Sequence, residues 1–368
     1  MQRRPTVSAG SRTQLSTMAS TPVRASPARR AASASTSGAR FRALRRHYTV
    51  TETLSEGGNS TVYRAVRCGT TGASDVLGEE VAIKIVSKSG LNEASRTALA
   101  REVVVLRQLA SDANSLRYLE VLEDVQHVYL VMELLVGGDL LSALTHRRSA
   151  FSAPDALRVV REVFCSLSAL HDRGIAHRDV KLENVMFADA DHSVVKLIDF
   201  GLCHRRRPGG DLHARQPCGT AAYSPPQIVM RAPYVPEEGD SWSVGVVLYA
   251  LLCRRLPFGS ASPADGGSAM EALGRRIVEA SPTLHGGVWD QIPFAVKELV
   301  SALLSKTGAD RPSAREAIEM IDEILVGLDD EVEEVTHEAL DLLAGAQSLM
   351  HALTGSRKSA SPTRRSEH

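Results

Sequence analysis

The stretch His177-Arg-Asp-Val-Lys-Leu-Glu-Asn184 decides the fold when it is read together with two other short stretches. Asp199-Phe-Gly201 follows it after about the length of a strand pair, and Val81-Ala-Ile-Lys84 lies well upstream. Each stretch alone is short enough to arise by chance. All three in this order and spacing are not expected by chance, so they indicate one site assembled from distant parts of the chain.

These motifs resemble those of the protein kinase family, and the resemblance covers about residues 48–326. It implies an α+β fold of two lobes, a small antiparallel β lobe over residues 48–135 and a larger helical lobe over residues 136–326.

The type of kinase is indicated by shorter signals. Lys181, two positions after Asp179, and the later pair Gly219-Thr220 are the serine/threonine form of the motifs. The Trp-Ser-x-Gly pattern within Asp240–Gly245 and the Leu-Pro-Phe of residues 256–258 resemble the calcium/calmodulin-dependent kinase group.

The hydrophobic pattern predicts strands followed by helices. Alternating, β-branched segments predict strands at Thr49–Leu54, Thr61–Val66, Glu80–Val86 and Val128–Met132. Helical spacing predicts helices at Arg96–Leu109, Pro154–Asp172, Asp240–Leu252, Pro293–Leu304 and Ser313–Leu325. This order also indicates a β lobe followed by a helical lobe.

The resemblance assigns the chemistry to a few residues. The transferred γ-phosphoryl group of ATP reacts through a loose transition state, so the protein mainly positions it and neutralises its charge. Asp179 would accept the proton of the substrate hydroxyl, and Lys181 would stabilise the γ-phosphate. Asn184 and Asp199 would supply oxygen ligands for Mg²⁺, a hard cation that suits carboxylate and amide groups. Asp240 would hydrogen-bond the backbone of the catalytic loop.

The remaining nucleotide-binding positions are also implied by the resemblance. Lys84 would reach the α- and β-phosphates, and Glu102 would pair with it; taken alone, the two could be solvated surface charges. Met132 would be the gatekeeper, and the carbonyl of Glu133 and the amide of Leu135 would bind adenine. The other positions assigned to nucleotide binding are Leu54, Ser55, Gly57, Gly58, Val62, Ala82, Asp139 and Met186.

The stretch Leu54-Ser-Glu-Gly-Gly-Asn-Ser-Thr-Val62 is either a phosphate-binding loop or an ordinary turn between two strands. Ser55 and Ser60 stand where the family usually has glycine, whereas Gly57 keeps the central glycine. Backbone amides bind phosphate and serine is a small substitute for glycine. Because the other kinase motifs are present, the sequence favours the phosphate-binding loop over an ordinary turn.

Residues 202–218 contain no Ser, Thr or Tyr. Kinases with an arginine before the catalytic aspartate, as Arg178 is here, often order this segment through a phosphate. We therefore expect activity without phosphorylation of this segment, with Asp211 as a partner of Arg178 or of a nearby arginine. The alternative is that the segment is simply flexible.

A second departure from the family is Tyr223-Ser-Pro-Pro-Gln227, where Ala-Pro-Glu is usual. The glutamate normally pairs with an arginine of the helical lobe, which is expected to be Arg311 here. Gln227 can accept a hydrogen bond but cannot neutralise a buried guanidinium. The substitution therefore concerns stability more than chemistry.

Two acidic residues are candidates for contacts with the protein substrate. Asp139 and Glu183 would receive a basic residue that lies N-terminal to the target Ser or Thr. The alternative is that both are solvated or nucleotide-facing carboxylates, and the sequence leaves the two possibilities equal.

The composition sets wider limits. The chain has 368 residues, a net charge of zero and 43% apolar residues, as in ordinary globular proteins. No apolar run reaches about 18 residues, so no membrane span is expected, and no nucleic-acid partner is expected either. The five cysteines are scattered without metal-ligand spacing and predict thiols in a reducing compartment.

The N-terminus has its own composition. Residues 1–46 carry ten arginines and no Asp, Glu or Lys, so residues 1–47 are expected to be a disordered basic leader. The protein would then be cytoplasmic or nuclear. Organellar import is the alternative, because transit peptides are also rich in Arg and Ser.

Residues 327–354 are expected to form a helical extension, followed by a disordered tail over residues 355–368. Apolar residues repeat at 3-4 spacing, namely Ile318, Ile321, Leu325, Leu328, Val332, Val335, Ala339, Leu342, Ala346, Leu349 and Leu353. Gly327 and Asp329-Asp330 are positions where two helices would separate. The extension either folds on its own lobe, associates with a partner or second copy through residues 328–353, or blocks the active site. Its acidic character argues against calmodulin, which prefers basic amphipathic helices.

The sequence therefore predicts an ATP- and Mg²⁺-dependent serine/threonine kinase that acts on protein substrates. A catalytically inactive scaffold is the alternative, supported only by the altered glycine loop and Gln227. The enzyme is favoured because the chain keeps the polar residues of the site, Lys84, Glu102, Asp179, Asn184 and Asp199. A small-molecule kinase of similar fold is a more distant alternative.

Overall fold

The computed structural model describes residues 44–57, 60–69, 77–109, 112–206, 209–261 and 268–330. The chain divides into two compact units, residues 1–319 and 320–368. The strands and labelled helices belong to the first unit, and the described part of the second, residues 320–330, is helical. The expected leader, Gly58, Asn59, most of the helical extension and the tail lie outside the described residues.

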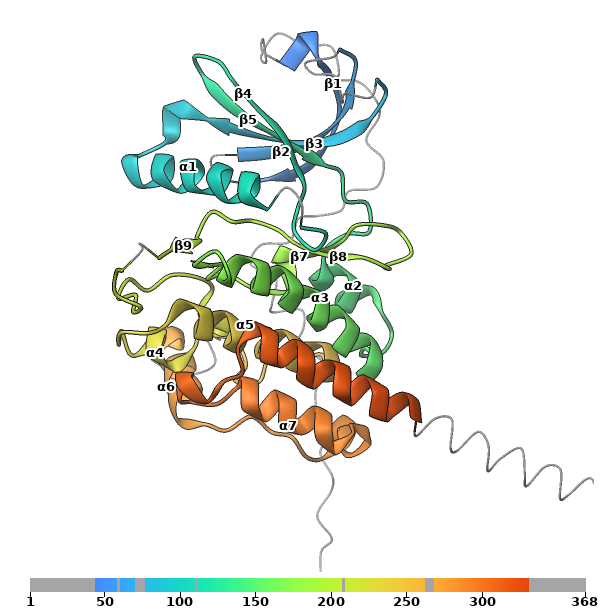
Figure 1. Ribbon diagram of the computed structural model, residues 1–368, viewed down its shortest axis with the longest axis vertical. Coiled ribbons are helices and arrows are strands. Elements are labelled where there is room, and N and C mark those ends of the chain that lie inside the picture. Colours follow the sequence, from blue (N-terminus) through green and yellow to red (C-terminus); the bar gives the residue numbers. More distant parts are fainter. Residues whose placement is uncertain are drawn as a thin grey trace, which may run out of the picture. The chain divides into compact units, whose positions relative to one another are not determined.

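Five antiparallel strands form the sheet of the small lobe, in the order β1-β2-β3-β5-β4 (Figure 1). Their bounds are β1 (Tyr48–Glu56), β2 (Ser60–Arg67), β3 (Glu80–Ser87), β4 (Tyr118–Glu123) and β5 (His127–Glu133). Helix α1 (Glu93–Gln108) lies beside the sheet (Figure 1). Asn92 caps α1, because its side chain accepts a hydrogen bond from the backbone N–H of Ser95.

The register of the sheet separates a cleft face from a core face. Val62 pairs with Lys84, and Ala82 pairs with Met132. Opposite residues, and residues two apart along one strand, share a face of a sheet, so these four side chains point the same way. The other face carries the buried core of this lobe, which consists of Leu44, Tyr48, Ala65, Val81, Ile83, Ile85, Tyr129 and Val131.

The larger lobe is helical. Its elements are α2 (Leu140–His146), α3 (Ala153–His171), α4 (Pro226–Val229), α5 (Pro236–Cys253), α6 (Ala269–Glu279), α7 (Phe294–Leu303) and a helix that begins at residue 314. Two small sheets flank residues 177–184 and 199–201, namely β6 (Ile175–Ala176) with β9 (His204–Arg205), and β7 (Val185–Phe187) with β8 (Val195–Leu197). Short 3₁₀ helices are η2 (Leu44–Arg46), η3 (Lys88–Gly90), η4 (Leu182–Asn184), η5 (Ala221–Tyr223), η7 (Gly287–Gln291) and η8 (Gly308–Asp310).

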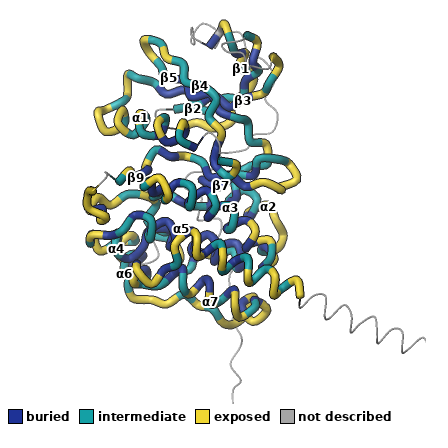
Figure 2. Tube along the Cα trace, in the orientation of Figure 1, coloured by how far each residue is buried: buried dark blue, intermediate teal, exposed yellow. Residues whose placement is uncertain are grey.

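Helix α5 is the centre of this lobe. It is buried over residues 239–252 and packs against α3 and α7 (Figure 2). Gly245 lets α7 approach closely, because a Cβ atom at this position would lie only 2.7 Å from Cβ of Leu303. Helix α5 carries apolar residues on every side, and such a helix is stable only when it is buried.

The structure confirms each predicted strand and helix within a few residues at the ends. It adds β4, α2, α4 and α6 and the short strands β6 and β9, which the pattern did not predict. It also corrects the expected break at Gly327, because the helix from residue 314 continues through Gly327 to residue 330, the last described residue. Within the described ranges, no helix combines the length and the apolar character that crossing a membrane requires.

Candidate active site

A cleft of about 480 Å³ in the first unit gathers the nucleotide-binding positions predicted from the sequence. The predicted residues that line it are Leu54, Ser55, Gly57, Val62, Ala82, Lys84, Glu102, Met132, Glu133, Leu135, Asp139, Asn184, Met186 and Asp199. Gly58 lies outside the described residues. Residues from both lobes therefore face one hollow, as the register of the sheet requires for Val62, Ala82, Lys84 and Met132.

Lys84 and Glu102 form the predicted ion pair. Lys84 projects from β3, Glu102 projects from α1, and Nζ lies 2.6 Å from Oε1. Burial disfavours the charged amine, but the carboxylates of Glu102 and Asp199 outweigh that effect and raise the pKa of Lys84 above its ordinary value. The ammonium is therefore firmly charged and fixed in the cleft.

Asp179 is the centre of a hydrogen-bond network beside the cleft. Its Oδ2 atom accepts from Lys181 Nζ at 2.7 Å and from Asn184 Nδ2 at 3.0 Å. Its Oδ1 atom accepts from the backbone N–H and the hydroxyl of Thr220, at 3.0 and 2.9 Å. The carboxylate is thus held in one orientation by the catalytic loop on one side and by the Gly219-Thr220 pair on the other.

Asn184 and Asp199 fit a hard divalent cation. The amide nitrogen of Asn184 is used by Asp179, with Nδ2 also donating to the backbone oxygen of Asp179 at 2.8 Å, so the amide oxygen is the free ligand atom. Asp199 has a left-handed backbone, with φ of 63°, and lines the same cleft. Across the described ranges no group of three or more His, Cys, Asp or Glu side chains could hold a metal. Two oxygen ligands from the protein suit a cation that keeps water and phosphate oxygens in its shell.

Asp240 hydrogen-bonds the backbone of the loop that carries Asp179, as the resemblance to kinases implied. This buried carboxylate of α5 accepts from the backbone N–H groups of His177 and Arg178, at 2.8 and 2.7 Å. It also contacts His171 Nε2 at 2.9 Å. Arg178 has φ of 67°, a region that non-glycine residues rarely adopt, so Asp240 offsets the cost of this backbone conformation.

Behind Glu133, which lines the cleft, lies a residue that the sequence did not reveal. Lys196 of β8 is buried, and its Nζ atom lies 2.7 Å from Oε1 of Glu133. The same oxygen accepts from the backbone N–H of Arg117 at 2.5 Å. The side chain of Glu133 is therefore anchored, and among the described residues the N–H of Leu135 has no hydrogen-bond partner. A lysine three residues before Asp199, inside a run of apolar residues, was the available signal.

The turn between β1 and β2 lies over the cleft. The N–H of Gly57 donates to the carbonyl of Ser60 at 2.7 Å, and Ser55, Gly57 and Ser60 all line the cleft. Because the turn lines the cleft, its position favours a phosphate-binding loop over an ordinary turn remote from the site.

The two acids expected to contact substrate differ in their surroundings. Asp139 caps α2, because its carboxylate accepts from the N–H and the hydroxyl of Ser142 at 2.8 and 2.7 Å. Glu183 has a buried Oε2 atom without a hydrogen-bond partner among the described residues. Burial raises the pKa of Glu183 above its ordinary value. Of these two carboxylates, Glu183 is therefore the one with an oxygen, Oε2, that lacks a hydrogen-bond partner among the described residues.

The expected pairing of Gln227 with Arg311 is confirmed, because Nη2 of Arg311 donates to Oε1 of Gln227 at 2.9 Å. The expectation that Asp211 pairs with Arg178 is corrected, and Arg215 only lowers the pKa of Asp211 through its charge, less than His213 does. Its carboxylate accepts from the N–H of His213 at 2.9 Å and contacts the ring of His213 at 3.1 Å. Arg178 instead donates to the carbonyl of Leu202 at 2.9 Å.

Comparison with known proteins agrees with this geometry. The family model described as "Protein kinase domain" matches residues 48–321. A calcium/calmodulin-dependent serine/threonine-protein kinase 1 of Oryza sativa subsp. japonica is 32% identical over 66% of this chain and 39% of its own length. A ribosomal protein S6 kinase alpha-4 of Mus musculus is 38% identical over 64% of this chain and 30% of its own.

A calcium/calmodulin-dependent protein kinase type 1 of Caenorhabditis briggsae is 32% identical over 75% of this chain and 72% of its own length. The first two relatives are much longer, and the match spans less than half of each. A protein kinase domain implies the use of ATP and of a divalent metal. The chain belongs to the protein kinase family.

Proposed function

We propose that this protein is a serine/threonine kinase that transfers the γ-phosphate of ATP to protein substrates, with Asp179 as the catalytic base. The observation that carries the proposal is the gathering of Lys84, Asn184 and Asp199 on one cleft, with Asp179 bonded to Asn184. Together these residues supply a base, a cation for the phosphates and oxygen ligands for a metal, which are the groups that phosphoryl transfer needs.

The hydrogen bonds around Asp179 support its role. Lys181 and Thr220 fix the carboxylate, so that it can accept a proton from a hydroxyl placed beside it without first reorienting. Lys181 also places a positive charge 2.7 Å from Asp179, where it would lie beside the oxygens of the transferred phosphoryl group and balance their negative charge. Preorganised charge of this kind is usually the largest contribution to catalysis.

Asn184 and Asp199 would hold Mg²⁺, which neutralises phosphate charge when it is bound. Lys84, fixed by Glu102, would bind the α- and β-phosphates. Ser55 and Gly57, with Gly58, would cover the phosphates through their backbone amides. The adenine would lie between the small and large lobes, against Leu54, Val62, Ala82, Met132 and Met186, with its edge on Glu133 and Leu135, and the ribose near Asp139.

We also propose a preference for substrates with a basic residue N-terminal to the target hydroxyl. Glu183 lines the cleft beside Asn184, and its Oε2 atom lacks a partner among the described residues. A guanidinium from the substrate would satisfy this buried oxygen.

Three further proposals concern regulation, association and location, and they rest on the charge pattern and the cysteines of the chain. Calmodulin is not expected as a regulator, in spite of the names of two relatives, because residues 328–353 are acidic. That segment would serve self-association or a partner. The free state of all five cysteines supports a location in the cytoplasm or nucleus, with organellar import as the alternative that mapping of the mature N-terminus tests.

The central proposal is tested by phosphate transfer from radiolabelled ATP to a generic basic protein in the presence of Mg²⁺. Asp179→Asn should lower the rate on the order of 10²-fold or more, while the thermal shift caused by ATP persists. Asp191→Asn, which changes an exposed acid in the same way, should keep full activity. Wild-type protein that labels no acceptor, or an Asp179→Asn variant as active as Asp191→Asn, would contradict the proposal.

A further inference from the structure

Two cations and one unpaired N–H group gather at the ring of Trp242 in the larger lobe, outside the nucleotide cleft. Trp242 of α5 is fully buried, and its Nε1 atom has no hydrogen-bond partner among the described residues. The guanidinium carbon of Arg311 lies 5.0 Å from the centroid of this ring, and Nζ of Lys306 lies 5.1 Å from it. We call these three side chains the Trp242 cluster.

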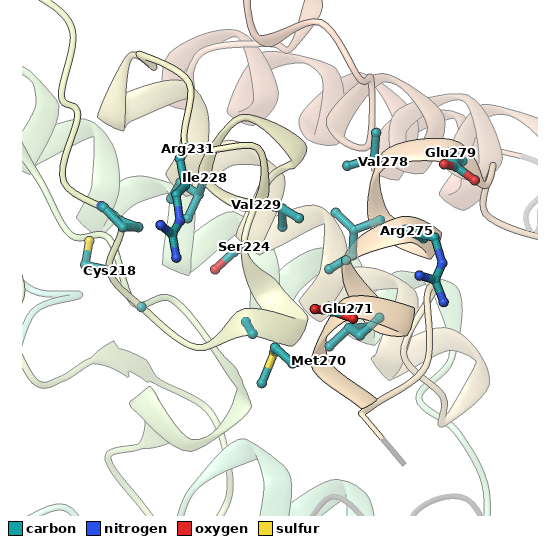
Figure 3. A pocket seen from close by; sticks show the side chains of 16 residues that line it. Cys218, Ser224, Ile228, Val229, Arg231, Met270, Glu271, Arg275, Val278 and Glu279 are labelled. Atoms are coloured by element: carbon teal, nitrogen blue, oxygen red, sulfur yellow. The ribbon is translucent and has the colours of Figure 1, made fainter. Parts of the chain in front are cut away.

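The cluster is joined to α4 and α6, the two helices that flank the hollow drawn in Figure 3. Nη2 of Arg311 donates to Oε1 of Gln227 in α4 at 2.9 Å. The residue after Gln227, Ile228, is labelled in Figure 3. Nζ of Lys306 donates to the carbonyl of Ile277 in α6 at 2.6 Å. Both cations therefore hold these helices through neutral oxygen atoms.

Arg311 lacks a bonded anion among the described residues. The oxygens that accept from its guanidinium are neutral, namely the amide oxygen of Gln227 and the backbone carbonyls of Ser305, Lys306 and Glu238. Burial lowers the pKa of Arg311 to about 10, although the charges of Glu238 and Asp310 act to raise it. A buried guanidinium of this kind would be stabilised by an anion in contact with it.

Lys306 has the character of a nucleophilic amine. Its Nζ atom lies 4.2 Å from the centroid of Phe258, whose ring stacks on that of Trp242 at 5.5 Å. Burial, together with the charge of Arg311, lowers the pKa of Lys306 to about 8. About half of the amine is therefore neutral near pH 8, and only the neutral amine has a free electron pair. The residue is not fully buried, which leaves access for a small solute.

We propose that carbon dioxide adds reversibly to Nζ of Lys306, and that the resulting carbamate supplies the anion that Gln227 does not give to Arg311. The electron pair of the neutral amine forms an N–C bond, one C–O π pair moves onto oxygen, and a proton leaves the nitrogen for water. One carbon dioxide is consumed, one proton is released and nothing is oxidised. This modification does not depend on the proposed kinase function.

A carbamate suits the groups of the Trp242 cluster. It keeps one N–H, which would continue to donate to the carbonyl of Ile277. Its oxygens extend up to about 2.3 Å from the nitrogen, taking the bond lengths of a peptide group, and would accept from Arg311 and from Nε1 of Trp242. These bonds replace the cation–π contacts that the ammonium loses, and a hydrogen bond between two charged groups is stronger than a neutral one.

The direct test uses wild-type protein with carbon-13-labelled bicarbonate at pH 8, which supplies labelled carbon dioxide. The NMR spectrum should show a carbamate carbon bound to the protein. Alkylation with a trialkyloxonium salt should then trap the carbamate, and mass spectrometry should find the label on Lys306. A spectrum without this resonance, or label on other amines alone, would overturn the inference.

Thermal unfolding at pH 8 tests whether the carbamate stabilises the fold. Bicarbonate should raise the Tm of wild type by a few degrees, relative to a carbon dioxide-free buffer of equal ionic strength. Lys306→Arg keeps a cation but has no nucleophilic amine, so its Tm should not respond. Lys297→Arg changes another partly buried lysine and should respond as wild type does. A response that persists in Lys306→Arg would show that bicarbonate acts as an ordinary anion, which contradicts the inference.

The link to Arg311 is tested with Gln227→Glu. This variant supplies a carboxylate of its own, so bicarbonate should raise its Tm by less than half of the rise in wild type. Gln291→Glu, which changes an exposed residue in the same way, should keep the full rise. Equal responses of the two variants would refute the role assigned to the carbamate.

Discussion

At the scale of single residues, Arg311 and Gln227 show how one substitution changes the electrostatics of a buried site. The guanidinium of Arg311 is 7% exposed and donates to Gln227 Oε1 at 2.9 Å and to the carbonyl of Glu238 at 3.0 Å. Burial lowers the pKa of Arg311 to about 10. A buried cation whose hydrogen-bond acceptors are neutral carries a desolvation cost that a carboxylate would reduce.

Gln227→Glu should therefore stabilise the protein. A hydrogen bond to a charged group contributes about 1 kcal/mol more to the unfolding free energy than a neutral one does. This gain corresponds to a rise in Tm of a few degrees. The lost amide bond from Gln227 Nε2 to the carbonyl of Lys306, at 2.6 Å, reduces but does not cancel the gain, because Arg311 Nη2 lies 3.4 Å from that carbonyl. Thermal unfolding measures the effect, with the exposed Gln291→Glu as control. A lower Tm than wild type would refute the pairing argument.

The charge of Lys306, next to Arg311, should make the stability of the folded protein depend on pH. Its ammonium lies over the ring of Phe258, 4.2 Å from the centroid, and burial together with Arg311 lowers its pKa to about 8. The unfolded chain keeps the ordinary value of 10.5, so between pH 8 and pH 10.5 the unfolded state binds more protons. Stability must then rise with pH through this group over that range.

Lys306→Gln isolates this effect, since other groups titrate equally in both proteins. The unfolding free energy of wild type minus that of Lys306→Gln should increase between pH 7.5 and about pH 9.5. Urea titrations at three pH values would measure this increase. The change should be modest, because the side chain is only partly buried. An unchanged difference would show that Lys306 stays charged in the folded protein.

At the scale of elements, β8 and the end of β5 are joined by an ion pair behind the position proposed for adenine. Lys196 of β8 bonds the carboxylate of Glu133 at 2.7 Å and is 9% exposed. The N–H of Arg117 bonds the same carboxylate oxygen. These contacts hold the Glu133 side chain, so the backbone of residues 133–135 is fixed where adenine would bind.

Lys196→Met should raise the KM for ATP about fivefold to tenfold and leave kcat within twofold, because it disturbs a binding contact and not the transferred group. It also leaves the carboxylate of Glu133 partly buried without its cation. Steady-state kinetics with varied ATP measures both constants. The double variant Lys196→Met with Glu133→Gln should recover much of the KM. A fall in kcat without a change in KM would count against this role.

The prediction of elements from sequence succeeded where periodicity and burial agree. In β3, Lys84 stands between buried Ile83 and Ile85, and the β-branched pattern predicted the strand. The ion pair of Lys196 was not predicted, because contact between two strands far apart in sequence leaves no periodic signal. Helix α6 was also missed; it contains Gly274, which lowers helix propensity.

At the scale of the whole catalytic unit, two arginine side chains connect the segment after Asp199-Phe-Gly201 to both lobes. Arg101 of α1 donates to the carbonyl of Cys203 at 3.1 Å, and Arg178 donates to the carbonyl of Leu202 at 2.9 Å. The Lys84–Glu102 pair is formed at the same time. The sequence predicted that the segment lacks an acceptor for phosphate. It offered Asp211 as a partner of Arg178 or of a nearby arginine, because a backbone carbonyl cannot be recognised as a partner from sequence.

Activity should therefore survive removal of phosphate. Protein treated with a phosphatase should keep more than half of its rate, because two arginine-to-carbonyl bonds supply the order that a phosphate supplies in other kinases. Arg101→Ala should lower kcat several-fold in treated and untreated protein alike, since it removes one of these bonds, whereas Arg96→Ala, an exposed position on the same helix, should have little effect. Both measurements use the same peptide substrate at saturating ATP. Loss of most activity on phosphatase treatment, with the released phosphate mapped to a site other than Thr220 or the two ends of the chain, would mean that the two arginine bonds do not suffice.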